Sequence, residues 1–145
     1  MDKLLIKNGI VVDPLTKTEI KRDVYIENGI IKDLPAKKQA GAKQTGVKTL
    51  SADGLVVFPG LIDMHVHLRE PGYEYKETIE SGMRAAISGG FTSICCMPNT
   101  NPVNDSEEIT RFLIDKAKNL DLINLFPIGA ISKGLKGTSL ADIGK

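Results

Sequence analysis

Residues 63–72 of the chain read Asp63-Met64-His65-Val66-His67-Leu68-Arg69-Glu70-Pro71-Gly72. They continue an apolar run that begins at Leu61, and they close on a Pro-Gly turn, where a strand is expected to end. Side chains two residues apart on a strand point to the same face. One face is therefore predicted to carry Asp63, His65, His67 and Arg69, and the other the apolar Ile62, Met64, Val66 and Leu68. A barrel strand requires such a division, with an apolar side against helices and functional groups near its carboxyl end.

Downstream of this strand, the pattern alternates between strands and helices. It predicts strands over 61–68, 91–97 and 122–128, helices over 77–88 and 107–119, and the start of a further helix over 138–145. This alternation indicates an α/β fold, with a parallel sheet and outer helices. An open doubly wound sheet and a closed barrel both fit the order. The connection 69–76 lacks the G-x-G-x-x-G pattern of a dinucleotide-binding sheet, which weakens the first alternative.

The ends of the two helices carry local signals. Gly89-Gly90 is expected to close the first helix. Asp105 and Glu108 have the spacing of a capping box at the start of the second. The predicted apolar face of that second helix consists of Ile109, Phe112, Leu113 and Ala117.

The first part of the chain has a different pattern, with short apolar runs separated by turns. Asn8-Gly9 and Asn28-Gly29 each lie between β-forming residues, which predicts two hairpins. Residues 37–48 are polar and are predicted to form a loop. We therefore expect residues 1–55 to belong to a small β-sheet layer and residues 56–145 to form a separate α/β part.

Composition excludes several classes of function. The chain has 145 residues, of which 41% are hydrophobic and 26% are charged, with a net charge of +1. A nucleic-acid footprint would need a strong basic bias, and no apolar stretch has the length of a membrane span. The start of the chain lacks a signal-peptide pattern, so a cytoplasmic location is expected. The adjacent Cys95 and Cys96 point to opposite faces of a strand and are expected to be small core residues.

His65 and His67 are the only two histidines in the sequence. Two imidazoles on one strand face can reach a common metal ion at the usual Zn–N distance of about 2.0–2.1 Å. A catalytic zinc takes three protein ligands and a water, so two histidines do not complete a site. Asp63 lies one step deeper on the strand and is not expected to be a ligand. The remaining ligands must come from elsewhere.

Three further side chains follow strand ends on the same side of the predicted sheet. Arg69 follows the histidine pair, and its guanidinium group suits the carboxylate of an anionic substrate. Asn99 follows the second strand and offers both a donor and an acceptor to a cyclic amide, although an Asn beside Pro is often turn chemistry alone. Lys133 follows the third strand and is expected to be an exposed loop residue.

These stretches resemble the amidohydrolase superfamily and, within it, the dihydroorotases. The resemblance is carried by residues 65–72, by Gly89-Gly90-Phe91-Thr92, by Met97-Pro98-Asn99-Thr100, by residues 58–63 and by residues 129–135. It covers the whole chain but about a third of such an enzyme. It implies that the chain forms the first three β/α units of a (β/α)₈ TIM barrel, preceded by part of a small β-sandwich. About 250 residues are needed for a complete barrel, so this chain is expected to be incomplete and inactive alone.

The resemblance also implies a chemistry. His65 and His67 would bind the first of two zinc ions, and Arg69 and Asn99 would hold the carboxylate of the substrate. The reaction would interconvert N-carbamoyl-L-aspartate and dihydroorotate in pyrimidine biosynthesis, through a water made acidic by the metals. A bridging carboxylate, two further histidines and the general acid/base Asp would lie beyond Lys145. The family further implies a small-molecule substrate, and a homo-oligomer or an association with aspartate carbamoyltransferase.

Two other interpretations fit the same residues. Allantoinases and hydantoinases share the H-x-H strand, but Arg69 and the Met-Pro-Asn-Thr segment are more typical of dihydroorotases. A short non-catalytic homologue could instead serve as a binding or assembly partner. The intact His65, His67 and Arg69 argue against that interpretation, because a chain without catalysis has no evident need of them.

Overall fold

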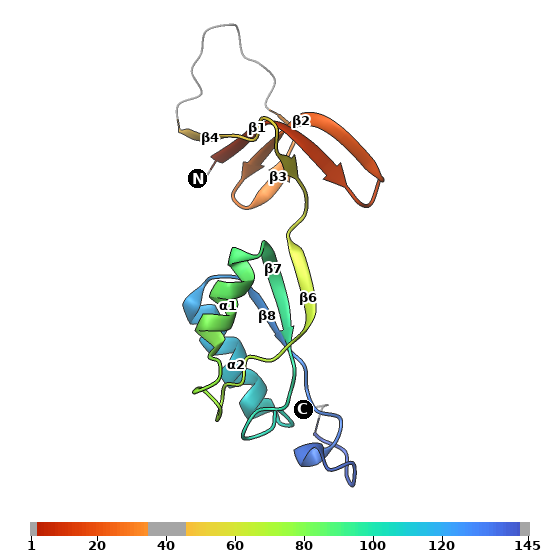
Figure 1. Ribbon diagram of the computed structural model, residues 1–145, viewed down its shortest axis with the longest axis vertical. Helices are drawn as coiled ribbons and strands as arrows, with labels where there is room; N and C mark the ends of the chain where they lie inside the picture. The colour runs from red at the N-terminus through yellow and green to blue at the C-terminus, as the bar shows by residue number, and fades with distance from the viewer. Residues whose placement is uncertain (1–2, 35–45, 143–145) are drawn as a thin grey trace, which may run out of the picture. The chain divides into compact units, whose positions relative to one another are not determined.

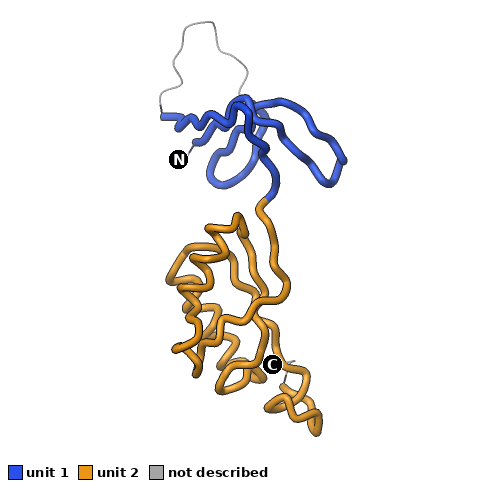
Figure 2. Tube along the Cα trace, in the orientation of Figure 1, with its two compact units in different colours: residues 1–59 blue, residues 60–145 orange. Residues whose placement is uncertain are grey.

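The structure is a computed structural model that describes residues 3–34 and 46–142. The chain divides into two compact units, Met1–Pro59 and Gly60–Lys145, which Figure 2 distinguishes by colour. In the described part of the chain, no helix is both long enough and apolar enough to cross a membrane.

Unit 1 is a five-stranded sheet (Figure 1). Its strands are β1 (Lys3–Asp13), β2 (Thr18–Glu27), β3 (Ile30–Lys32), β4 (Val47–Ser51) and β5 (Val56–Val57). The order is β3-β2-β1-β4, with β5 also paired to β1. β1 is antiparallel to β2 and parallel to β4 and β5. Since β5 pairs with β1, this unit extends to Pro59.

The two Asn-Gly pairs have different roles in this sheet. Asn28-Gly29 forms the predicted hairpin between β2 and β3, with φ angles of 53° and 76°. The hairpin predicted at Asn8-Gly9 is wrong, because β1 runs through this pair and only its register with β2 shifts there. Asn8 has a φ of 65° and donates its backbone N–H to Asp23 Oδ1 at 2.9 Å. A residue with positive φ can form a bulge as well as a turn, and here it forms the bulge.

The predicted polar loop over 37–48 falls mostly on residues 35–45, which lie outside the described residues. Its last two positions do not belong to a loop. Val47 and Lys48 are the first residues of β4, where they pair with Lys3 and Leu4 of β1.

Unit 2 is a three-stranded parallel sheet with two helices packed against it (Figure 1). The strands are β6 (Leu61–Val66), β7 (Phe91–Cys96) and β8 (Asn124–Pro127), in that order across the sheet. The helices are α1 (Ile79–Ser88) and α2 (Glu107–Leu120), and a short 3₁₀ turn, η1 (Lys133–Leu135), follows β8. The predicted alternation of parallel strands and helices is therefore confirmed up to β8.

The helix predicted over 138–145 is wrong for the part that the structure describes. Residues 138–142 contain no helix, and Leu140 instead forms an antiparallel bridge with Ser132. The backbone N–H of Ala141 donates to the carbonyl of Ile131 at 2.8 Å. The chain after β8 thus folds back on itself. Residues 143–145 lie outside the described residues.

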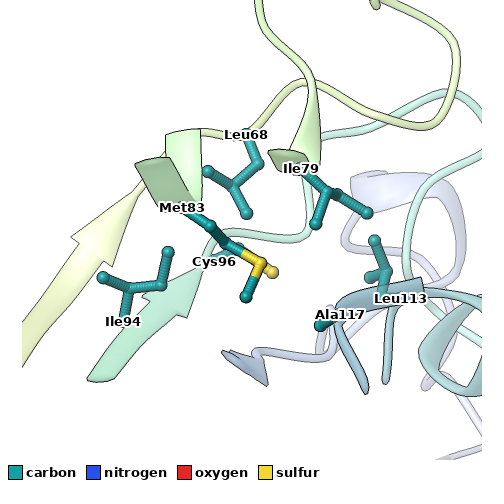
Figure 3. Packing of buried hydrophobic residues seen from close by; sticks show 7 residues of the cluster. All are labelled: Leu68, Ile79, Met83, Ile94, Cys96, Leu113 and Ala117. Carbon is teal, nitrogen blue, oxygen red and sulfur yellow. The ribbon is translucent and has the colours of Figure 1, made fainter. Parts of the chain in front are cut away.

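One hydrophobic cluster joins the sheet to both helices (Figure 3). Its members are Leu68, Ile79, Met83, Ile94, Cys96, Leu113 and Ala117. Burial raises the pKa of the Cys96 thiol to about 11, so this thiol stays protonated at neutral pH. Cys95 is only half-buried, and neither cysteine forms a disulfide. The cluster fixes which face of β7 is turned toward the helices, namely the face of Ile94 and Cys96.

The helix ends agree with the sequence at α1 and differ at α2. Thr78 and Ser81 cap the start of α1 reciprocally, and Gly89 ends it as predicted. The capping box predicted from Asp105 and Glu108 is wrong, because Ser106 is the N-cap residue and makes no side-chain cap. Asp105 Oδ2 accepts the backbone N–H of Gly134 at 2.6 Å, so its carboxylate joins the loop after β8 to the start of α2.

Gly82 of α1 allows the close approach of Leu68, the residue that directly follows His67. A Cβ at position 82 would lie 2.3 Å from Leu68 Cδ2, and Leu68 is only 4% exposed. We expect Gly82→Val to lower the free energy of unfolding by about 1–3 kcal/mol through overpacking, measured by urea unfolding of the chain. Gly129→Val is the matched control, since a Cβ there meets nothing within 4 Å, and its effect should be within about 0.5 kcal/mol. Equal effects of the two variants would contradict this account.

Candidate metal centre

A register irregularity in β6 decides which of its side chains face the helices. Asp63 pairs with Ile94 and Val66 pairs with Cys96, so β6 holds one more residue than β7 between these pairs. Paired residues of neighbouring strands share a face, and Ile94 belongs to the core under the helices. By this pairing, Asp63 lies on the helix side.

The predicted division of β6 is thus correct only beyond this irregularity. Asp63 does not share a face with the histidines, contrary to the sequence-based prediction. Ile62 pairs with Ser93, which lies opposite the helix side, so Ile62 is not on the apolar face either. Met64 is 75% exposed, whereas Val66 packs against the core and Leu68 belongs to it. An extra residue in a strand shifts the alternation, so the residues before it lie on the opposite sheet face from the one that a regular strand would give them.

His65 and His67 lie side by side at the carboxyl end of β6. Their ring centroids are 5.2 Å apart with the ring planes at 66°. The backbone N–H of His65 donates to Asp63 Oδ1 at 3.0 Å, so the displaced carboxylate supports the strand next to the pair. Both imidazoles are exposed. The structure therefore brings together the two nitrogen ligands that the sequence predicts.

Asn99 reaches the histidine pair from the end of β7. Asn99 Oδ1 lies 2.8 Å from His67 Nδ1, and these two atoms form a hydrogen bond. An amide oxygen can only accept, so the hydrogen-bonded Nδ1 carries the proton. In the neutral ring, this leaves the lone pair of Nε2 for a cation.

Arg69 starts the connection from β6 to α1, with a φ of 64° and a half-buried side chain. No described carboxylate forms an ion pair with its guanidinium group. The connection is fastened to the loop after β7, because Asn101 donates its backbone N–H to the Pro71 carbonyl at 2.9 Å. Gly72 has a φ of 93°, and a Cβ there would lie 2.1 Å from Asn101 O. The loops that carry Arg69 and Asn99 are therefore in backbone contact.

Glu70 is a buried carboxylate that the sequence analysis did not identify. It is 4% exposed, and its Oε2 accepts the N–H of Ile79, the first residue of α1, at 2.9 Å. Its Oε1 accepts a hydrogen bond from Lys116 Nζ of α2. Glu70 thus attaches the segment directly after Arg69 to both helices.

Asn104 is a second buried polar residue that the sequence analysis missed. It is 1% exposed; its side chain donates to the Ile128 carbonyl at 3.0 Å and accepts from Thr110 Oγ1 at 2.7 Å. Its backbone carbonyl accepts the N–H of Ala130 at 2.7 Å, and its own N–H donates to Pro98 O at 3.0 Å. Asn104 therefore holds the loops after β7 and β8 together at the carboxyl edge of the sheet. No local pattern marks it, since the strand end that it contacts, at Ile128, lies 24 positions away.

The residues present fit a zinc ion as an incomplete set of ligands. Two adjacent imidazoles, one of them with its Nδ1 engaged by an acceptor, are characteristic of zinc sites in which an outer partner fixes the ring. Among residues 3–34 and 46–142, no group of three or more His, Cys, Asp or Glu side chains is placed to hold a metal. Lys133 is exposed, as predicted, and does not belong to the set. A complete site needs ligands besides these two.

Solved structures share this arrangement of strands and helices. The L-hydantoinase (dihydropyrimidinase) from Arthrobacter aurescens superposes with a TM-score of 0.75 at 22% identity, over 91% of this chain and 28% of that one. The D-hydantoinase (dihydropyrimidinase) from Thermus sp. superposes with a TM-score of 0.67 at 30% identity, over 89% of this chain and 28% of that one. The first likeness, at its low identity, is evidence for the fold alone.

Sequence comparison defines the family more narrowly. The family model described as Dihydro-orotase-like matches residues 54–145. The dihydroorotase of Ruminiclostridium cellulolyticum is 52% identical over 143 residues, which are 99% of this chain and 32% of that protein. The chain therefore belongs to the dihydroorotase-like family, and the resemblance seen in its motifs is confirmed. It spans about a third of the length of the curated relatives that it matches.

Proposed function

We propose that the chain supplies the first metal ligands and a substrate clamp to a dihydroorotase, which interconverts N-carbamoyl-L-aspartate and dihydroorotate in pyrimidine biosynthesis. The observation that carries the proposal is the His65–His67 pair, with ring centroids 5.2 Å apart, beside Asn99 and Arg69 at one edge of a parallel sheet. Active sites of (β/α)₈ barrels lie at this carboxyl edge. In this proposal, residues 56–145 form the first three β/α units of such a barrel and residues 1–55 part of a β-sandwich.

Zinc fits the proposed ligands best, because imidazole nitrogen is a preferred zinc ligand. His65 and His67 would hold the first of two ions. When bound, the metal would supply an acidified water and polarise the carbonyl of the substrate. The remaining ligands and the general acid/base Asp would come from outside residues 1–145. From the family resemblance, we also propose that the enzyme is cytoplasmic. It would form a homo-oligomer or associate with aspartate carbamoyltransferase.

The substrate clamp consists of Arg69 and Asn99. Dihydroorotate and carbamoyl aspartate are anionic, and a guanidinium group matches a carboxylate in both charge and geometry. Among the described residues, no carboxylate forms an ion pair with Arg69. Asn99 adds the N–H donors of its amide, because its oxygen is already bonded to His67. Backbone contact between the two loops, through Asn101 and Pro71, keeps these side chains at the same edge.

The alternative is a hydrolase of the allantoinase or hydantoinase type. The likeness to the D-hydantoinase of Thermus sp., at 30% identity and a TM-score of 0.67, is the observation in its favour. Arg69 argues for dihydroorotase, because the rings of hydantoin and allantoin carry no carboxylate for a guanidinium group to bind. A non-catalytic binding or assembly partner is a third possibility, for which no feature of the site gives support.

A direct assay separates these functions. A full-length dihydroorotase-like protein that carries these 145 residues would be stripped of metal, reloaded with zinc, and offered dihydroorotate, allantoin and hydantoin in turn. We expect zinc-dependent turnover of dihydroorotate, and of carbamoyl aspartate in the reverse direction. Turnover of allantoin or hydantoin alone would select the alternative. Loss of all three activities in a zinc-loaded protein would favour the non-catalytic partner.

A further inference from the structure

We propose that Asn99 is a positioning residue for the metal as well as a substrate ligand, and that a single amide performs both tasks with its two ends. This inference rests on the proposed function. It adds a role for the contact between the segments that follow β6 and β7. It begins from the 2.8 Å hydrogen bond between Asn99 Oδ1 and His67 Nδ1. The two residues are 32 positions apart in the chain, so the contact is made by the fold and not by local sequence.

The direction of this hydrogen bond follows from the chemistry of the two groups. A neutral imidazole that binds a cation through Nε2 must carry its proton on Nδ1. That Nδ1–H needs an acceptor, and the amide oxygen of Asn99 is one. The contact therefore stabilises the tautomer of His67 that can bind a metal, and it also fixes the rotation of the ring. Outer partners of metal-bound histidines have this effect in zinc sites generally.

The same hydrogen bond fixes the orientation of the amide. With Oδ1 on His67, the Nδ2 group has two N–H donors left, and a carboxylate is the natural acceptor for them. Asn99 is only half-buried, so this end remains accessible to a small molecule. Because Asn99 Oδ1 accepts a hydrogen bond from His67, the Nδ2 end of the amide is the end that can donate to the substrate. Recognition of the carboxylate and binding of the metal become linked through one side chain.

Aspartate and alanine at this position separate the two tasks. A carboxylate accepts the Nδ1–H as well as an amide does, but it offers no donor and repels an anionic substrate. Asn99→Asp should therefore keep the zinc affinity of the parent and lose substrate binding. Asn99→Ala removes both contacts, so it should lower zinc affinity about 10–100-fold and also raise KM. Arg69→Ala is the matched control, because the ring hydrogen bond of His67 comes from Asn99 and not from Arg69, and it should raise KM without a change in zinc affinity.

The experiment compares these three variants with the parent in the full-length protein. Zinc affinity is measured by competition with a chromogenic chelator, KM with dihydroorotate, and folding by circular dichroism. The inference holds if Asn99→Ala weakens zinc binding while Asn99→Asp and Arg69→Ala do not. Unchanged zinc affinity in Asn99→Ala would overturn it and leave the proposed function standing. A folded parent that binds no zinc would overturn the proposed function, and this inference with it.

Discussion

Replacing His65 with alanine in a full-length dihydroorotase that carries this segment should remove its first zinc ion and abolish turnover. The imidazole is one of the two proposed nitrogen ligands, with a ring centroid 5.2 Å from that of His67. Loss of an outer partner of a metal ligand costs about 10–100-fold in affinity, and loss of the ligand itself costs more. Metal content after gel filtration, measured by atomic absorption, checks this expectation, together with the rate of dihydroorotate hydrolysis.

Asp63→Asn is the control for that experiment. The carboxylate of Asp63 lies on the helix side, and the amide oxygen of the substituted asparagine can still accept the N–H of His65. It should retain the zinc of the parent. Full zinc occupancy in His65→Ala would refute the assignment of the pair as ligands. Loss of zinc in Asp63→Asn would show instead that the strand presents its carboxylate to the metal.

Lys116→Met should destabilise the chain more than Glu70→Gln does. The Glu70 carboxylate is 4% exposed and the Lys116 side chain 40% exposed, so the two partners differ in access to water. Without the lysine, a buried charge keeps only the N–H of Ile79, and we expect a loss of about 2–4 kcal/mol. Glu70→Gln keeps an acceptor for that N–H, and the ammonium group can turn to solvent. Its cost should be nearer 1 kcal/mol.

The double variant completes the cycle, since it removes both charges and leaves no ion unpaired. Its free energy of unfolding should exceed that of Lys116→Met alone, which urea unfolding monitored by circular dichroism can measure. Additive losses in the double variant would mean that the two side chains do not interact. The ion pair would then contribute little to the free energy of unfolding.

Much of the fold of unit 2 could be predicted because its signals are local. The helical spacing and Gly89-Gly90 define α1, and the β-α alternation defines the parallel order. The failures involve partners outside the segment on which each prediction was based. Asp105 has the spacing of a helix cap, but it bonds to Gly134, which is 29 positions away. The tail has no helix over 138–142, because Leu140 pairs back with Ser132.

The predictions for the candidate site succeeded or failed for the same reasons. His65 and His67 were evident from their spacing, and the structure places them side by side. The displacement of Asp63 could not be predicted, since the extra residue in β6 shows only in its pairing with β7. The burial of Glu70 and Asn104 was not predicted, because a polar residue next to proline or in a loop is ordinarily exposed. Their burial depends on Lys116 and Ile128, which lie 46 and 24 positions away.

The extra residue in β6 also bears on which metals this part of the site would accept. A regular strand would carry Asp63 on the face of His65, one step deeper than the imidazoles, and would place a carboxylate on that face. Oxygen ligands suit magnesium, calcium and manganese, whereas imidazole suits zinc and its neighbours in the first transition row. By turning the carboxylate toward the helix side, the strand leaves a donor pair of nitrogen alone. If His65 and His67 are ligands as proposed, this backbone irregularity would favour zinc and its neighbours over magnesium and calcium at their end of the site.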